Sequence, residues 1–178
     1  IAEAAQARGA QVVLVTGPTA LQQPKGIEVV SVATAEEMMK ALSSRLAWST
    51  TVIMAAAVVD FRPTNPALQK LKKQGRTGQT LELERTTDIL ASLSAQRTTQ
   101  LMVGFAAETN DLIAHAKRKL TEKGLDLIVA NDITTLGGGF GSDQNAATLI
   151  DREGALTELP LMPKRALADA ILNRAQEL

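Results

Sequence analysis

Three segments of the sequence consist almost entirely of apolar residues and have the length of one β-strand. They read TTVIMAAAVV (50–59), QLMVGFAA (100–107) and LDLIVAN (125–131). Continuous apolar runs of this length are typical of strands that are buried on both faces of a parallel sheet. Parallel neighbours need crossover connections, and these are usually helices. This pattern therefore predicts an α/β fold with helices on both faces of a mostly parallel sheet.

Helical patterns and turn signals between these runs support the same fold. Thr34 and Glu37 form a capping box, which predicts the start of a helix. Helices are expected at 34–47, 87–96, 111–123 and 163–177, and shorter strands at 11–16, 27–32 and 81–85. The turn REG between 146–151 and 155–161 predicts an antiparallel hairpin. We therefore expect a Rossmann-like, doubly wound sheet with this hairpin added, and an antiparallel excursion over residues 60–85.

The first residues carry a helical pattern, IAEAAQAR, which Gly9 ends and the strand pattern QVVLVTG follows. In an α/β sheet, a helix that leads into a strand normally has another strand before it. We therefore expect residues 1–178 to form a single domain that lacks the first strand of its sheet and the loop after that strand.

The composition excludes several classes of site. The 19 basic residues balance the 19 acidic ones and aromatic residues make up 2%, which argues against a nucleic-acid partner. The sequence has no Cys and one His, His115, so disulfides, thiolate chemistry and zinc sites built on these residues are excluded. No apolar run approaches the ~20 residues of a membrane span, and no signal peptide is visible. We expect a cytoplasmic protein without a membrane partner.

Ligands of open α/β sheets bind outside the carboxyl ends of the strands, which makes the residues at these ends candidates. Asp60 follows the strand at 50–59 and could accept hydrogen bonds from a ligand, or could cap the turn before Pro63. Phe105 could line a ligand site or pack in the core. Asn131 precedes the glycine-rich stretch TLGGGFGSDQN, which fits a loop that closes over a ligand and fits a flexible linker equally well.

Basic residues gather in two places. The stretch LQKLKKQGRTG (68–78) contains three lysines and an arginine but no acidic residue. Lys119 and Lys123 are one turn apart on the helix expected at 111–123, so they share a face. Charge runs are usually solvated surfaces, but lysines also bind and stabilise phosphates. Together the two clusters favour a triphosphate or pyrophosphate ligand.

Five motifs occur in an ordered arrangement: AAAVVDFRP, KLKK, GFAAETN, AND and GFGSDQN. Their order and spacing resemble the phosphopantothenate–cysteine ligases, the phosphopantothenoylcysteine synthetases of coenzyme A biosynthesis. This ligase is usually the C-terminal half of a bifunctional bacterial protein. The resemblance extends over essentially the whole chain.

The resemblance implies a Rossmann-like homodimer that uses CTP and Mg²⁺. Such an enzyme converts 4′-phosphopantothenate to an acyl-cytidylate with release of pyrophosphate. L-cysteine then attacks the acyl carbon and CMP leaves. FMN would belong only to a decarboxylase domain further upstream. The resemblance does not identify the ligands of the Mg²⁺ ion.

The resemblance also implies a set of site residues. Those of the CTP site are Met54, Ala55, Ala56, Asp60, Lys70, Thr87, Asp88, Ile89, Leu90, Phe105, Lys119 and Lys123. Asp60 would read the cytosine ring, and the lysines would hold phosphates. Lys70 and Asn131 would take part in catalysis, and residues 138–145 resemble a mobile flap of the family.

The sequence departs from the family pattern in places. Thr86-Thr87 stands where the family usually has Asn-Pro, and AAAVVD replaces the commoner AAVAD. The family's opening strand and an asparagine-containing SSG loop lie outside these residues, so the chain could bind CTP without completing the reaction. A non-catalytic nucleotide-binding or dimerisation module is therefore an alternative. An NAD(P)-dependent Rossmann reductase is a weaker one, because the sequence contains no Tyr.

Overall fold

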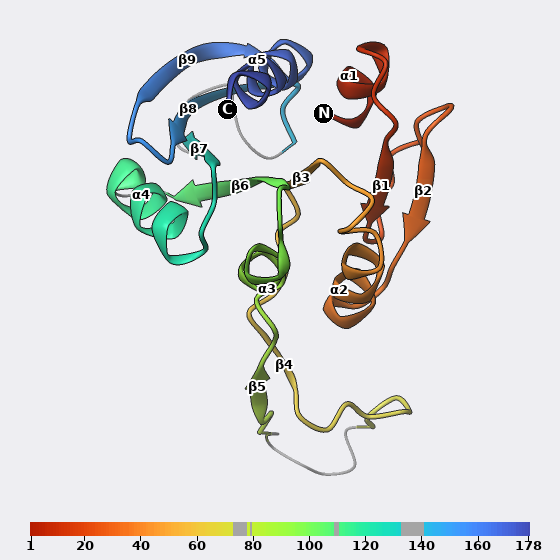
Figure 1. Ribbon diagram of the computed structural model, residues 1–178. Helices are drawn as coiled ribbons and strands as arrows, with labels where there is room; N and C mark the ends of the chain where they lie inside the picture. The colour runs from red at the N-terminus through yellow and green to blue at the C-terminus, as the bar shows by residue number, and fades with distance from the viewer. Residues whose placement is uncertain (73–77, 79, 109–110, 133–140) are drawn as a thin grey trace.

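The computed structural model describes residues 1–72, 78, 80–108, 111–132 and 141–178 (Figure 1). Within these residues the helices are α1 (Ala2–Ala7), α2 (Ala35–Ser43), α3 (Ile89–Gln96), α4 (Leu112–Glu122) and α5 (Lys164–Glu177). The strands are β1 (Val13–Thr16), β2 (Glu28–Ser31), β3 (Thr51–Met54), β4 (Phe61–Pro63), β5 (Leu83–Arg85), β6 (Leu101–Glu108), β7 (Leu127–Asp132), β8 (Gln144–Asp151) and β9 (Leu156–Pro163). No helix of this part of the chain is both long and apolar enough to cross a membrane.

The main sheet has the strand order β3-β6-β7-β8-β9. Its first three strands are parallel, and β8 and β9 form the antiparallel hairpin at its end. β1 and β2 form a separate parallel pair, and β4 and β5 form an antiparallel ribbon. The predicted α/β fold with a mostly parallel sheet and an added hairpin is confirmed. The separation of β1 and β2 from the main sheet was not predicted.

Two apolar clusters lie on opposite faces of the main sheet. One joins α2, α3 and α4 to the side chains of Met102, Ile128 and Ile150. The other joins α5 to Val103, Leu127, Val129 and Leu149. Successive residues of a strand point to opposite faces, so the apolar runs fill both clusters. The predicted layers of helices on both faces are thus confirmed.

Two predicted elements are longer than the observed ones. The strand expected at 50–59 ends at Met54, because residues 55–59 leave the sheet toward the β4–β5 ribbon. There, the amide of Thr86 donates to the carbonyl of Asp60 at 2.9 Å. The helix expected at 34–47 starts with the predicted capping box but ends at Ser43, where the chain enters tight turns.

The β4–β5 ribbon extends away from the rest of the molecule (Figure 1). Arg62 on β4 pairs with Glu84 on β5, with 2.8 Å between Nε and Oε1. The antiparallel excursion predicted for residues 60–85 is therefore confirmed where the structure describes it. The basic stretch 68–78 lies in the segment between β4 and β5, and its residues 73–77 lie outside the described part.

Gly104 on β6 lies close to the side chains of Leu90 and Leu125. A Cβ atom at this position would lie 2.6 Å from Cδ1 of Leu125 and 2.9 Å from Cδ2 of Leu90. We expect Gly104→Ala to lower the free energy of unfolding by about 2 kcal/mol, because the added methyl group overpacks the core. Denaturant titration measures this change. Gly78→Ala is the matched control, since the new methyl group would meet nothing within 4 Å there; equal stability of the two variants would contradict the prediction.

Candidate functional site

Four of the predicted residues lie at the N-terminal end of α3. Asp88 is the N-cap, and its Oδ1 accepts a hydrogen bond from the amide of Ala91 at 3.1 Å. Ile89 and Leu90 are 2% and 4% exposed, so their side chains belong to the core. Thr87, which precedes the cap, is exposed. Ile89 and Leu90 can therefore meet a ligand only through their backbone, at the positive end of the helix dipole.

The two predicted lysines, Lys119 of α4 and Lys123 at the C-cap of α4, lie beside this helix end. The Nζ atom of Lys123 is 2.8 Å from Oδ2 of Asp88, and Nζ of Lys119 donates to the carbonyl of Phe105 at 2.7 Å. Burial of the Asp88 carboxyl opposes its ionisation. Hydrogen bonds from Lys123 and the Ala91 amide outweigh this effect, so the pKa of Asp88 lies below its ordinary value. The site thus combines two ammonium groups, one carboxylate and a helix N-terminus.

Asp60 joins the same region through its backbone. Its carbonyl accepts from the amide of Thr86, two residues before Asp88, while its side chain is exposed. Met54 ends β3 and pairs with Gly104 of β6, and Ala55 and Ala56 follow it as exposed residues. The carboxyl ends of β3 and β6 therefore bring the predicted strand-end residues close to α3.

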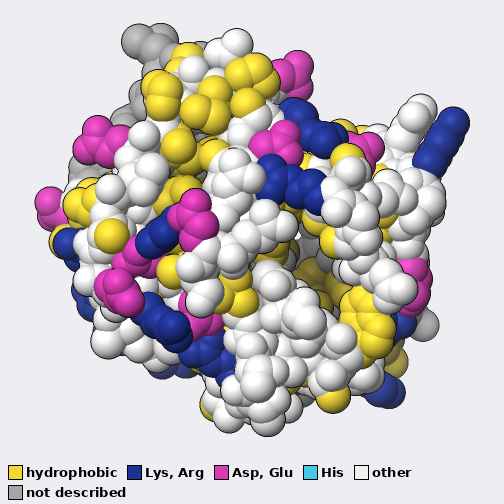
Figure 2. All heavy atoms as spheres, turned by 45° about the horizontal axis from the view of Figure 1, so that its top comes forward, with side chains coloured by type: hydrophobic (Ala, Val, Ile, Leu, Met, Phe, Trp, Pro, Cys, Tyr) yellow, Lys and Arg dark blue, Asp and Glu magenta, His cyan; other side chains and the backbone are white. Residues whose placement is uncertain are grey.

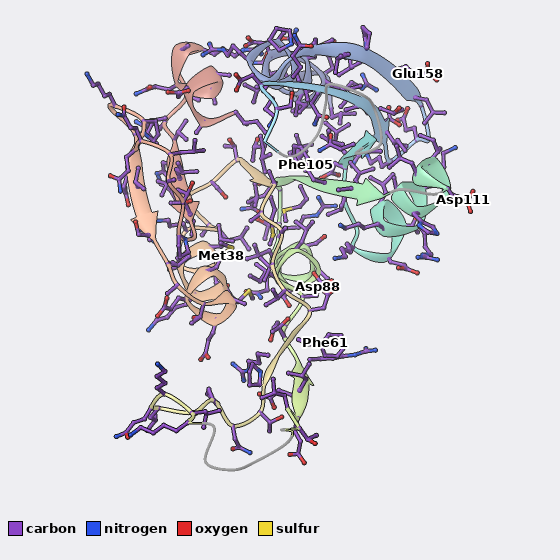
Figure 3. The ribbon with its side chains drawn as sticks, turned by 180° about the vertical axis from the view of Figure 1, so that it is seen from behind. Met38, Phe61, Asp88, Phe105, Asp111 and Glu158 are labelled. Carbon is purple, nitrogen blue, oxygen red and sulfur yellow. The ribbon has the colours of Figure 1, made fainter. Side chains whose placement is uncertain are left out.

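The other face of the main sheet, which α5 covers, carries a pocket. A pocket of about 310 Å³ is lined by Ala55, Phe105 and Asn131, and by Leu167 and Ile171 of α5. Figure 3 shows Phe105 on β6, separated by α3 and Asp88 from Phe61 on the ribbon. The predicted residues therefore divide between two sides of the sheet, a charged side at α3 and α4 and a mostly apolar side at α5.

Asparagine side chains supply polarity to the apolar pocket. Oδ1 of Asn131 is buried and accepts no hydrogen bond from any described residue. Asn145 also lines the pocket and is 7% exposed. Asn145 belongs to β8, so the prediction of a mobile flap over residues 138–145 is wrong at this residue. Residues 138–140 lie outside the described part. Sequence reasoning missed Asn145 as a site residue, and its only signal was its place in the GFGSDQN motif.

The fold brings Lys70 neither to the charged side at α3 and α4 nor to the pocket at α5. Lys70 is exposed and lies in the segment between β4 and β5, beyond the end of the ribbon that extends away from the sheet (Figure 1). Its catalytic role stays a prediction. His115, partly buried on α4, was not expected to act as a base and is not placed in the site.

The arrangement offers no ready-made metal site within the described residues. No group of three or more His, Asp, Glu or Cys side chains in these residues could hold a metal ion. The charged side can bind an anion through two lysines and a helix N-terminus. The apolar side can hold a chain with few polar atoms.

Comparisons with known proteins agree with this architecture. The sequence model of the DNA/pantothenate metabolism flavoprotein C-terminal domain family matches residues 1–178. The coenzyme A biosynthesis bifunctional protein CoaBC of Bacillus subtilis (strain 168) is 46% identical over 179 residues, covering 100% of this chain but 44% of that protein. The chain thus spans less than half the length of this relative.

Solved structures share the fold. The crystal structure of the C-terminal domain of a CoaBC protein is 38% identical with a TM-score of 0.81, and the match covers 97% of this chain and 76% of that one. A structure described as a Cab2 mutant in complex with phosphopantothenate-cysteine is 19% identical with a TM-score of 0.63, over 85% of this chain and 53% of that one. From its sequence and its fold, the chain belongs to the DNA/pantothenate metabolism flavoprotein C-terminal domain family.

Proposed function

We propose that this chain is the ligase part of a cytoplasmic coenzyme A biosynthesis enzyme that joins 4′-phosphopantothenate to L-cysteine with CTP. The observation that carries the proposal is the pair Lys119 and Lys123 beside the N-terminus of α3, at the carboxyl ends of β3 and β6. This is where α/β folds bind nucleotides. Membership of a family with CoaBC relatives supports the substrate class.

The reaction needs a leaving group on the acyl carbon. A carboxylate oxygen of 4′-phosphopantothenate attacks the α-phosphorus of CTP, the bond to the bridging oxygen breaks, and pyrophosphate leaves. The amine nitrogen of L-cysteine then attacks the acyl carbon and CMP leaves. Positive charge from Lys119 and Lys123 would stabilise the triphosphate and the departing pyrophosphate.

The two sides of the site match the two substrates. The charged side at α3 and α4 suits the triphosphate. The pocket with Phe105, Asn131 and Asn145 suits the amide-containing acyl chain, because amide side chains can pair with amide groups. Mg²⁺ usually binds through substrate phosphates and one or two carboxylates. The described residues form no protein cage for it, so we assign no step to a protein-held metal ion. FMN would require an upstream decarboxylase domain.

Thermal unfolding with nucleotides tests the proposal. We expect CTP with Mg²⁺ at 100 times its Kd to raise the Tm of the chain by about 5–10 °C, because a ligand that binds only the folded state stabilises it. ATP should raise the Tm much less, and NADPH should not change it. Equal effects of ATP and CTP would contradict a cytosine-reading role of Asp60. A rise with NADPH alone would favour the reductase alternative.

We also propose that the chain forms a homodimer through the β4–β5 ribbon. A two-stranded ribbon is marginally stable alone, yet this one and its flanks expose many large apolar side chains. They are Val59 (64% exposed), Phe61 (51%), Leu68 (101%), Leu71 (58%), Leu81 (65%) and Leu83 (55%). An exposed apolar surface of this kind marks an interaction site. A second copy would cover it and could also receive Lys70.

Light scattering after gel filtration tests the dimer. We expect the wild-type chain to have twice the monomer mass and Phe61→Asp to have the monomer mass, because a charge at the interface is not paired there. Leu21→Asp is the matched control, since Leu21 is 80% exposed but lies outside the ribbon. A monomeric wild-type chain, or a dimeric Phe61→Asp variant, would contradict this interface. A dimer that binds CTP but does not turn over, even with the upstream residues restored, would instead favour the non-catalytic module.

A further inference from the structure

The carboxylate of Asp60, which the proposed function assigns to the cytosine ring, is exposed. Among the described residues it forms no hydrogen bond and no ion pair. Other charged side chains are paired: Arg8 and Arg165 both reach Asp169, and Figure 2 shows further basic side chains beside acidic ones. The position that Asp60 offers to a ligand therefore depends on how its own backbone is held.

The backbone around Asp60 is held by one residue that follows β5, Thr86. The amide of Thr86 donates to the carbonyl of Asp60 at 2.9 Å, and its Oγ1 hydroxyl donates to the carbonyl of Val59 at 2.5 Å. The paired part of the β4–β5 ribbon ends at Phe61 and Arg85. The hydroxyl of Thr86 therefore bonds a stretch of chain that strand pairing no longer reaches, and no other described residue donates to the carbonyl of Val59.

The phosphate end of the site is fixed by contacts that do not involve Thr86. Ile89 and Leu90, the first residues of α3, are buried in the core. The N-cap Asp88 pairs with Lys123 of the neighbouring helix end. These contacts hold the N-terminus of α3 whether or not the Thr86 hydroxyl is present. The base end and the phosphate end of a bound nucleotide thus depend on different parts of the structure.

We propose that Thr86 is a positioning residue that holds Asp60 for the recognition of the base, and that it thereby sets the preference of the site for one nucleobase. This inference rests on the function proposed above. One hydrogen bond of this kind changes the population of a backbone conformation by about fivefold. The apparent affinity for a ligand falls with the population of the conformation that binds it. Loss of the hydroxyl should therefore weaken the base contact and spare the phosphate contacts.

Thr86→Val tests this assignment, because valine keeps the branched shape and the main-chain amide but lacks the hydroxyl. Calorimetry on the chain gives the Kd for CTP, for ATP and for pyrophosphate, each with Mg²⁺. We expect the variant to raise the Kd for CTP about fivefold and to change the other two Kd values by less than about twofold. The preference for CTP over ATP should fall by the same factor.

Two further variants serve as controls. Thr86→Ser keeps the hydroxyl and should restore the Kd for CTP to within about twofold of the wild-type value. Thr64→Val removes the same kind of bond at the other end of the ribbon, where Oγ1 of Thr64 donates to the carbonyl of Glu82 at 3.4 Å. This variant should leave the preference for CTP unchanged, because the lost bond does not touch the segment that carries Asp60.

A double-mutant cycle shows whether Thr86 acts through Asp60. Asp60→Asn keeps the size of the side chain but removes its charge. If Thr86 only positions Asp60, adding Thr86→Val to Asp60→Asn should raise the Kd for CTP by less than about twofold. A full additional loss in the double variant would show that Thr86 acts independently of Asp60 and would overturn the proposal.

The outcomes separate this inference from the proposed function. A wild-type chain that binds ATP as tightly as CTP would contradict the base-reading role of Asp60 and, with it, both proposals. A wild-type chain that prefers CTP, together with a Thr86→Val variant that keeps the full preference, would overturn the role of Thr86 alone. Equal losses for CTP, ATP and pyrophosphate would also overturn that role, because a general loosening of the site does not discriminate between bases.

Discussion

Replacing Lys119 by Met is expected to weaken CTP binding and the release of pyrophosphate by about 100-fold each. Lys119 is partly buried on α4, and its Nζ donates to the carbonyl of Phe105 at 2.7 Å, next to the N-terminus of α3. Methionine keeps the length and apolar stem of the side chain but removes the positive charge. The loss should therefore reflect the missing charge opposite the phosphates and not a change in packing.

Calorimetry on the chain gives the Kd for CTP. Turnover is measured on a longer chain, in which the residues that precede the matched segment in the Bacillus subtilis CoaBC protein are joined to Ile1. Lys117→Met is the matched control, because Lys117 lies on the same helix but is exposed. It should change both quantities less than twofold. If Lys119→Met bound CTP as tightly as the wild type, the charged side of the site would not be the phosphate site.

Replacing Asp151 by Ala is expected to lower the free energy of unfolding by about 3 kcal/mol. Asp151 is 1% exposed at the turn between β8 and β9. Its Oδ1 accepts from the amides of Glu153 and Ala155, each at 2.9 Å, and its Oδ2 pairs with Arg174 of α5. Alanine would leave these donors without their acceptor and would remove the ion pair between the hairpin and α5.

The pH dependence of this loss follows from the pKa of Asp151. Burial opposes ionisation, but hydrogen bonds from Arg174 and the two amides outweigh it, so the pKa of Asp151 in the folded chain is lowered. The contribution of Asp151 is then complete above its unfolded pKa of about 3.9 and is lost as the pH falls through the folded pKa. Denaturant titrations should show the difference between the wild type and Asp151→Ala shrinking below about pH 4.

Glu158→Ala is the control for this experiment, because Glu158 is exposed on β9 (Figure 3). It should change the free energy of unfolding by less than about 0.5 kcal/mol at any pH. A loss at Asp151 that is the same at pH 3 and pH 7 would show that its ionisation does not stabilise the fold.

The local pattern of the sequence was sufficient to predict most elements. The apolar runs at 100–107 and 125–131 became β6 and β7, and the capping box of Thr34 and Glu37 starts α2. These predictions hold because they depend on side-chain periodicity and on hydrogen bonds within one turn of a helix. The strand predicted from the apolar run at 50–59 was too long. A strand continues only where a neighbouring strand pairs with it, and β6 pairs with β3 only as far as Met54.

The sequence by itself determined the α/β class, the strands that carry Phe105 and Asn131, and the shared face of Lys119 and Lys123. All of these follow from periods of two or 3.6 residues along the chain. Only the tertiary structure decided which groups meet. It pairs Lys123 with Asp88, 35 positions apart, and it places Asn131 and Asn145 at one pocket. It places Lys70 away from both the lysine–aspartate pair and the pocket. These outcomes depend on how β3, β6 and α3 pack and on where the β4–β5 ribbon leaves the sheet, and long-range contacts of this kind leave no local pattern in the sequence.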